Sequence, residues 1–338
     1  MSDWLPDVLG ADYQQLVLPL GADPDGEGDV VATLVRHRRP GTRGAFLHVH
    51  GYTDYFFQVG MAEHLVAQGF AFYALDLRKC GRSIRAGQTP HFVSDLSLYD
   101  TELNEALAIV RAECPPGPVV IGAHSTGGLI VPLWLDRLRP AGSGPAGSSP
   151  AGSGPVDGLL LNSPWFDLQG PAYHRSLLGS AVINLAGKLV PKRVIPVGGG
   201  GDSYGTSLHS SGKGEWTYDL TWKPLGGFPA RFGWLRAVRK AQAQLHRGLD
   251  VGCPSLLLRS ARSHFAREHR PEVDIADAVL DVAQIARWAG CLGDRTMTVP
   301  IEGARHDVFL STRPAREAAY DELDAWLLTL AENSAHAR

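Results

Sequence analysis

Cysteine is scarce in this sequence, and its four copies lie far apart. They are spread over 338 residues without any C-x-x-C pair (Cys80, Cys114, Cys253 and Cys291). This spacing argues against a disulfide scaffold and against a zinc knuckle, and reduced thiols fit it better. We therefore expect a cytoplasmic protein without a structural metal site.

A long apolar run and a surplus of basic charge are also missing. The longest apolar stretch, residues 177–190, is interrupted by Gly, Asn and Lys and is too short to span a bilayer. We interpret it as buried core of a helical region and expect no integral membrane association. The N-terminus lacks the basic and apolar segments of a signal peptide. The formal net charge is −3, which argues against a nucleic-acid partner, and the oligomeric state stays open.

Short apolar runs recur along the chain, and helical patterns separate most of them. The expected strands are residues 30–37, 45–50, 70–77, 118–124, 158–162, 254–259 and 296–301. The expected helices are residues 59–68, 96–113, 127–137, 279–289 and 314–330. Nearly continuous Val, Ile, Leu and Phe in the strands is typical of parallel sheets that are buried on both faces. The alternation predicts an α/β fold with a mainly parallel, doubly wound sheet.

Two regions break this alternation. Residues 140–155 repeat a Pro/Ala/Gly/Ser pattern, which predicts a flexible surface linker without a chemical role. Residues 165–250 are rich in aromatic residues and are long enough to fold as a lid over the C-terminal edge of the sheet, where open α/β sheets bind ligands. We therefore divide the chain into an N-terminal segment (1–29), a first core part (30–164), the lid (165–250) and a second core part (251–338).

The most informative segment carries Ser125 between an apolar strand and an apolar helix. It reads A-x-S-x-G, with Ala123 and Gly127 two positions before and after the serine. A sharp strand-to-helix turn needs small residues at these positions because its two arms nearly touch, and it is the usual site of a nucleophilic serine. The alternative is a serine that caps the helix or binds phosphate. A phosphate loop needs other glycine spacing and usually a Lys.

A serine hydroxyl needs a base, and the base needs a carboxylate that fixes its tautomer. His306 follows the last expected strand, so it should lie at the same edge of the sheet as Ser125. The acid should follow the strand before that one. Asp277 is our first choice because it opens the helix that leads into the last strand, with Asp281 second and Asp274 third. Asp277 could also simply cap that helix.

The oxyanion of an acyl-transfer reaction needs backbone N–H donors. One should come from Thr126, directly after the nucleophile, and the other from Tyr52, after a strand that ends in His50-Gly51. We expect His50 to hold this loop and His124 to pack behind the serine turn, so neither is a second base.

Together these segments resemble the monoacylglycerol lipase and lysophospholipase-like branch of the α/β-hydrolases, also called the serine aminopeptidase-like hydrolases. The residues that carry the resemblance are 50–52, 76–83, 123–128, 277–281 and 302–306, and the resemblance covers residues 30–135, 156–166 and 250–330. Residues 76–83 resemble the family's D-x-R-x-x-G-x-S segment, which shapes the pocket floor. The departures are Ala123 in place of glycine, a long loop before Asp277, and the insert at 140–155.

The resemblance implies acyl transfer to Ser125 and then hydrolysis, without a metal or organic cofactor. The expected partner is a small-molecule ester with an apolar acyl group, contacted by Tyr52, Trp165 and Phe166. A thioesterase, acyltransferase, lactonase, amidase, peptidase or haloperoxidase-like activity could use the same residues. Epoxide hydrolases and dehalogenases need a carboxylate where Ser125 stands. A non-catalytic ligand-binding homologue is the alternative from another class.

Overall fold

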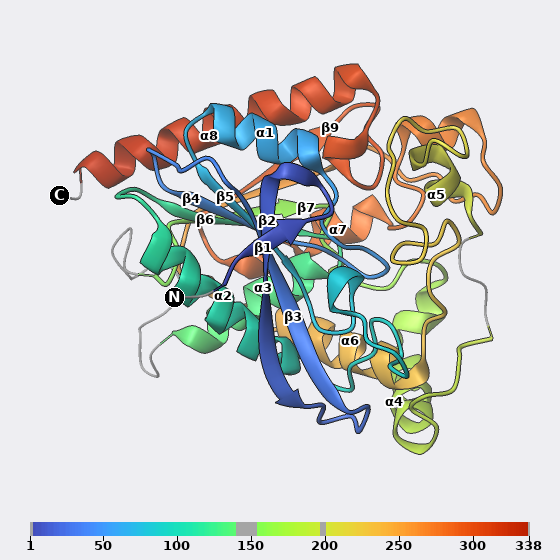
Figure 1. Ribbon diagram of the computed structural model, residues 1–338. Coiled ribbons are helices and arrows are strands. Elements are labelled where there is room, and N and C mark those ends of the chain that lie inside the picture. The colour runs from blue at the N-terminus through green and yellow to red at the C-terminus, as the bar shows by residue number, and fades with distance from the viewer. Residues whose placement is uncertain (1–2, 140–153, 197–200, 337–338) are drawn as a thin grey trace.

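The computed structural model describes residues 3–139, 154–196 and 201–336 (Figure 1). The linker predicted at 140–155 lies outside the described residues except for its last two positions. None of the four cysteines, all of which are described, forms a disulfide. In the described part of the chain, no helix is long and apolar enough to cross a membrane.

The centre of the molecule is one sheet, in which the described residues contribute nine strands in the order β1-β2-β3-β5-β4-β6-β7-β8-β9. Strands β1 and β2 pair antiparallel with each other, and β3 pairs antiparallel with both β2 and β5. All neighbours from β5 to β9 are parallel. The strands are β1 (Leu5–Asp7), β2 (Gly10–Ala22), β3 (Asp29–His37), β4 (Ala45–Val49), β5 (Ala71–Asp76), β6 (Val119–His124), β7 (Gly158–Asn162), β8 (Ser255–Ser260) and β9 (Thr296–Ile301).

The mainly parallel α/β sheet predicted from the sequence is therefore confirmed, and each of the seven expected strands is present within one residue at either end. Strands β1 and β2 were not expected. Most side chains of β2 are exposed or half-buried because it lies near the edge of the sheet, so it lacks the apolar run that marks the central strands. The N-terminal segment is thus part of the sheet.

Helices cover both faces of the sheet. On one face lie α1 (Val59–Ala67) and α8 (Arg313–His336), whose apolar side chains share a core cluster with Phe46 and Val120. On the other lie α2 (Asp100–Glu113), α3 (Gly127–Leu138) and α7 (Val282–Trp288), which share a cluster with Leu47 and Ile121. Successive strand residues point to opposite faces, so a continuous apolar strand packs against helices on both faces. Figure 1 shows α1 and α8 above the sheet and α2 and α3 below it.

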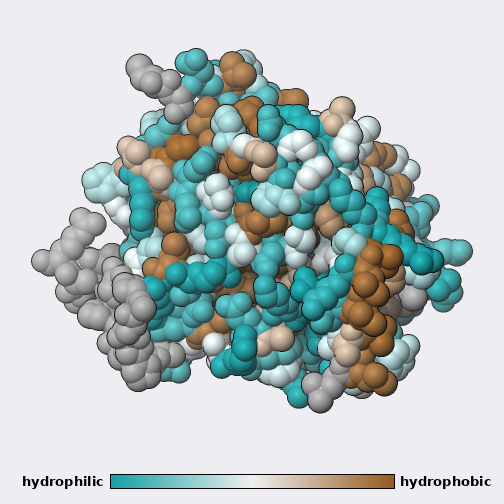
Figure 2. Space-filling model, turned by 90° about the horizontal axis from the view of Figure 1, so that it is seen from below, coloured by the Kyte–Doolittle hydropathy of each residue, from teal (hydrophilic) through white to brown (hydrophobic). Residues whose placement is uncertain are grey.

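Between β7 and β8 the chain forms α4 (Leu177–Leu189), α5 (Ser203–Leu208) and α6 (Phe232–Leu245), at the right of Figure 1. Helix α6 packs on α3 and buries its apolar face. Helix α4 packs on α6 but points four apolar side chains at solvent, with exposed fractions of 59 to 75% (Leu178, Val182, Leu185 and Leu189). Interpreting residues 177–190 as buried core was therefore wrong for this face. Figure 2 shows an apolar band on the side where α4 lies.

Candidate active site

Ser125 occupies a strained turn between β6 and α3. Its φ of +52° is a left-handed value that residues other than glycine rarely adopt. Backbone hydrogen bonds hold this conformation: the Ser125 N–H donates to the carbonyl of Asn162, and the Ser125 carbonyl accepts from Trp165, each at 3.0 Å. A Cβ atom built at Gly127 would lie 2.5 Å from the carbonyl oxygen of His50. Glycine is thus required after the serine, while Ala123 fits before it.

The structure brings Ser125, His306 and Asp277 together at the C-terminal edge of the sheet. The distance from Ser125 Oγ to His306 Nε2 is 3.0 Å, and His306 Nδ1 lies 2.8 Å from Asp277 Oδ2. All three side chains are buried. The other oxygen of Asp277 accepts the backbone N–H groups of Val279 and Leu280, at 2.8 and 2.7 Å. Both oxygens of the Asp277 carboxylate are therefore hydrogen-bonded, and the one that faces His306 can orient the imidazole.

The two other acids weighed for this position have different partners. Asp281 caps α7, accepting the N–H of Ala283 at 3.0 Å. Asp274 forms an ion pair with Arg305 at 2.7 Å and contacts His269 at 3.1 Å. Neither carboxylate has a hydrogen bond to His306 within the described part of the chain. Asp277 does not cap α7 itself, although its carboxylate does hold Val279 and Leu280, two and three positions further on.

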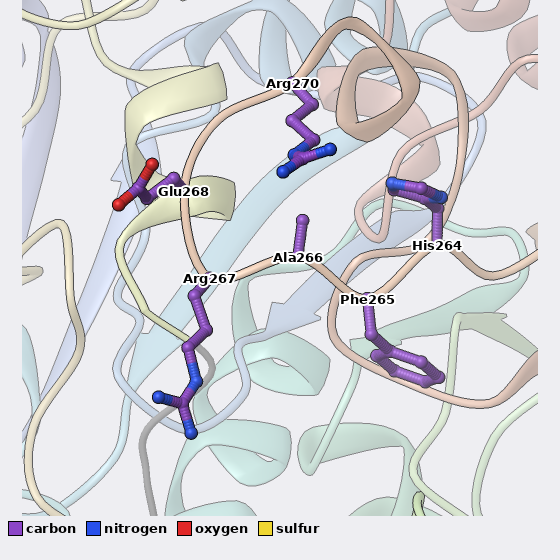
Figure 3. Close-up of a pocket in the computed structure, with 6 residues that line it drawn as sticks. All are labelled: His264, Phe265, Ala266, Arg267, Glu268 and Arg270. Atoms are coloured by element: carbon purple, nitrogen blue, oxygen red, sulfur yellow. The ribbon is translucent and has the colours of Figure 1, made fainter.

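The long loop before Asp277 folds back on itself. Asp277 pairs with Ser263 in a β-bridge: its N–H donates to Arg262, and its carbonyl accepts from His264. A hollow of about 370 Å³ lies on the outer part of this loop, and none of the candidate catalytic side chains lines it (His264, Phe265, Ala266, Arg267, Glu268 and Arg270). In Figure 3, Phe265 and Arg267 point to one side of the loop and His264 to the other. The loop therefore holds Asp277 in place, and its hollow is separate from Ser125.

The loop after β4 meets the serine turn at Gly51. A Cβ atom built there would lie 2.8 Å from Ser125 Cβ and 3.3 Å from Thr126 N. His50 Nε2 accepts the N–H of Leu77 at 3.1 Å, so its Nδ1 carries the proton and donates to the Gly51 carbonyl at 2.7 Å. In a trans peptide the N–H points opposite to the carbonyl. His50 therefore turns the N–H of Tyr52 away from itself.

Two backbone N–H groups beside Ser125 lack protein partners. Among the residues that the structure describes, neither the Tyr52 N–H nor the Thr126 N–H donates to a protein acceptor. Thr126 is buried and Tyr52 is half-buried, and buried N–H groups are nearly always paired. Two unpaired donors next to a strained serine could therefore receive the oxygen of a substrate.

The residues singled out for the pocket differ in their surroundings. The ring of Tyr52 packs on Trp234 with centroids 3.9 Å apart, and Trp234 stacks on Trp165 at 5.5 Å. Phe166 is completely buried in the main hydrophobic cluster. From the sequence, Trp234 counts only among the aromatic residues of 165–250 and receives no pocket role of its own, because it reaches this group from α6 and carries no motif.

A polar network behind the serine turn was also missed. Asn162, at the end of β7, donates to Asp307 at 2.7 Å and accepts the N–H of Val308 at 3.1 Å. The hydroxyl oxygen of Tyr204, on α5, accepts the N–H of Asp307 at 3.1 Å, and its ring meets that of His306 edge to face at 5.6 Å. Asn162 could have been found from the sequence, because it is a polar residue at the end of an apolar strand. No local sequence pattern identifies Tyr204.

Two further histidines lie near this network without joining the Ser125 hydrogen bonds. His124 faces the carbonyl of Asn162 through Nδ1 at 3.1 Å, and its ring centroid is 4.8 Å from that of His306. Burial lowers the pKa of His124 and lowers that of His48 to about 4, so both imidazoles favour the neutral form. Within the described residues, no group of three or more His, Cys, Asp or Glu side chains is placed to hold a metal ion.

Solved structures of lipases and esterases share this fold at low sequence identity. A soluble variant of monoglyceride lipase from Saccharomyces cerevisiae, in complex with a substrate analog, matches with a TM-score of 0.60 and 16% identity over 98% of this chain and 95% of that one. A lipase in its open form gives 0.61 and 16% over 94% and 99%. A carboxyl esterase from Bacillus coagulans, in complex with glycerol, gives 0.58 and 15% over 95% and 100%.

No curated protein sequence matches the chain significantly. A family model does: that of the serine aminopeptidase S33 family matches residues 40–270, about two thirds of the chain. This match covers the serine turn, the His50-Gly51 loop and the helices between β7 and β8. The chain therefore belongs to the serine aminopeptidase S33 family of α/β-hydrolases, and it is an enzyme of the hydrolase class.

Proposed function

We propose that this protein hydrolyses carboxylic esters with an apolar acyl group, using Ser125 as nucleophile, His306 as base and Asp277 as the orienting carboxylate. The observation that carries this proposal is the unbroken chain of hydrogen bonds from Ser125 Oγ through His306 to Asp277 Oδ2. A nucleophile whose base is oriented by a third group is the arrangement that covalent acyl transfer requires.

In the proposed reaction, Ser125 Oγ attacks the ester carbonyl while its proton passes to His306 Nε2. The negative oxygen of the tetrahedral intermediate accepts the N–H groups of Tyr52 and Thr126. The intermediate collapses, the C–O bond to the alcohol breaks, and His306 returns the proton to the leaving oxygen. Water then attacks the acyl-enzyme, again giving a proton to His306, and the acid product leaves as Ser125 regains its proton. Asp277 stabilises the imidazolium in both halves.

The aromatic group of Tyr52, Trp165 and Trp234 beside Ser125 favours an apolar acyl chain. We interpret residues 165–250 as a lid because α5 and α6 bring Tyr204 to His306 and Trp234 to Tyr52. An apolar site that excludes water strengthens the electrostatic interactions of the oxyanion with its donors.

The test is hydrolysis of p-nitrophenyl esters, from acetate to palmitate, by the wild type and Ser125→Ala. We expect serine-dependent hydrolysis with an optimum at one chain length, and nearly complete loss of activity in Ser125→Ala and in His306→Ala at unchanged Tm. Asp277→Asn should reduce turnover by about 10⁴-fold, as in well-studied triads. Asp281→Asn is the matched control, because Asp281 caps a helix nearby and should leave turnover almost unchanged.

Four outcomes would contradict the proposal. Equal activity of the wild type and Ser125→Ala would show that Ser125 is not the nucleophile. Loss of activity in Asp281→Asn but not in Asp277→Asn would reassign the acid. Hydrolysis of p-nitroanilides but of no ester would indicate an amidase or peptidase. Absence of any adduct with a fluorophosphonate would indicate a binding protein.

A further inference from the structure

The loop that follows β4 is fastened to the lid at four successive residues. We call residues 51–55 the oxyanion loop and residues 219–228 the inner lid segment. Each oxyanion-loop residue from 52 to 55 makes a polar contact with this segment. The contacts are Tyr52 Oη to the Phe228 carbonyl (3.5 Å), Phe228 N–H to Thr53 Oγ1 (3.0 Å), Lys223 Nζ to Asp54 Oδ1 (2.7 Å) and Asp219 N–H to Tyr55 Oη (2.8 Å).

The ion pair between Lys223 and Asp54 is the strongest of these contacts. Both side chains are buried, and the Lys223 ammonium also donates to the Thr53 carbonyl at 3.4 Å. Burial acts to raise the pKa of the Asp54 carboxyl, but the attraction of Lys223 outweighs it and holds that pKa below its ordinary value. The rings of Phe57 and Tyr218 lie 5.5 and 5.8 Å from the ammonium. The lysine therefore has one well-defined position.

The backbone between this ion pair and the candidate oxyanion donor is strained. Thr53, which joins Tyr52 to Asp54, has a φ of +52°, a left-handed value that is unfavourable for a β-branched residue. Strained backbone persists only where surrounding contacts hold it. The Thr53 N–H donates to His91 Nδ1 at 3.3 Å, and the contacts to its carbonyl and hydroxyl oxygens come from the lid, through Lys223 and Phe228.

We propose that Lys223 is a positioning residue for the reaction: it holds Asp54 and the Thr53 carbonyl so that the Tyr52 N–H stays aimed at the oxyanion. This inference rests on the proposed function, since it deepens the role of the same site. A hydrogen-bond donor stabilises the transition state only when it is already in place, and an error of about 1 Å is costly. Through Lys223 the lid thus completes the oxyanion hole, although the lysine itself does not touch the substrate.

Stability alone does not account for this pair. A buried ion pair costs desolvation, and apolar residues of similar volume often replace one without loss of stability. Another ion pair between lid and core, Lys240 with Asp95, has side chains that are 63% and 36% exposed and lies on the outside of α6. It offers a matched control, because losing it removes a lid–core contact of the same charge type away from the oxyanion loop.

The experiment compares Lys223→Met, the double variant Asp54→Asn/Lys223→Met and the control Lys240→Met on the best p-nitrophenyl ester. The measurements are kcat, KM, Tm and the inhibition constant of a trifluoromethyl ketone with the same acyl chain, whose serine adduct carries an oxyanion. We expect Lys223→Met to lower kcat by about 10- to 100-fold with KM nearly unchanged, less than the loss of a whole donor. The inhibition constant should rise by the same factor, while Lys240→Met should match the wild type.

The double variant distinguishes a loss of kcat caused by mispositioning of the Tyr52 N–H from one caused by lower stability. It also provides the test if Lys223→Met does not fold. It leaves no unpaired buried charge, so its Tm should be near that of the wild type, while kcat should stay low. Recovery of kcat together with Tm would overturn the inference, and so would an unchanged inhibition constant. Equal activity of Ser125→Ala and the wild type would instead contradict the proposed function. Serine-dependent hydrolysis with full kcat in the double variant would contradict only the role of Lys223.

Discussion

Residues 165–250, the proposed lid, have two parts that differ in how they meet the rest of the molecule. The inner part, α5, the inner lid segment and α6, contacts the oxyanion loop and the His306 loop through Lys223, Tyr204 and Trp234. The outer part, α4, packs on α6 and presents Leu178, Val182, Leu185 and Leu189 to solvent.

This difference reverses what residue type alone suggests. A lysine is buried in the inner part, whereas four aliphatic residues of the outer part are exposed. Lys223 can be buried because Asp54 is placed to neutralise it. The aliphatic residues of α4 are exposed because α4 meets α6 through other residues: Asn184 accepts from Arg236 at 2.7 Å, and Gly187 lies against the same side chain. Partners at a distance in sequence, more than polarity, determine which lid residues are buried.

The largest effect should come from removing the aromatic contact between the inner part and the oxyanion loop. Trp234→Ala leaves a cavity between Tyr52 and Trp165, and such substitutions in a core cost about 3–5 kcal/mol. The free energy of unfolding in urea measures the loss. Leu189→Ala on α4 is the control and should stay within about 0.5 kcal/mol, as is usual for surface changes. A loss below about 1 kcal/mol for Trp234→Ala would mean that the inner part is not integral to the core.

Local and repetitive features could be predicted from the sequence. The seven expected strands are apolar runs, and the turn around Ser125 is specified by small residues on either side. Parallel strands end at one edge of the sheet, so His306 and Asp277 could be expected near Ser125 from chain order. His306 does lie within hydrogen-bond distance of Ser125, and Asp277 within hydrogen-bond distance of His306. These inferences need only contacts within a few residues, or one general rule of the fold.

The remaining features depend on contacts between distant residues. Lys223 and Asp54 are 169 positions apart, and Tyr204 and Asp307 are 103 apart. No local pattern marks either pair. The exposed face of α4 could not be predicted for the same reason: an apolar helix face indicates that something can cover it but does not say whether the chain itself does.

A second, intermediate effect should appear in the pH dependence of stability. Burial lowers the pKa of His48 to about 4, and neither of its ring nitrogens has a partner among the described residues. A depressed pKa in the folded state means that stability is complete above the unfolded value, about 6.5, and is lost as the pH falls towards 4. At pH 5 the loss due to His48 is about 2 kcal/mol.

His48→Leu should therefore remove about 2 kcal/mol from the difference in unfolding free energy between pH 7 and pH 5. Urea unfolding at the two pH values measures that difference. The histidine lies beside the oxyanion loop, where Asp54 and Asp307 interact with its charge. An acid sensitivity equal to that of the wild type would show that His48 is not the group that titrates there.

The last comparison of the two parts is the sharpest, because it uses the same substitution on each. Val182 on α4 is 59% exposed, whereas Val238 on α6 is completely buried. Val and Thr have nearly the same shape and helix propensity, so Val→Thr tests burial of a hydroxyl alone. We expect Val238→Thr to cost about 1–3 kcal/mol and Val182→Thr to change the unfolding free energy by less than about 0.5 kcal/mol. A threonine hydroxyl destabilises the fold only where it is buried and loses its hydrogen bonds to water. Equal losses of unfolding free energy would therefore mean that in solution the exposed face of α4 is covered as well as the buried face of α6.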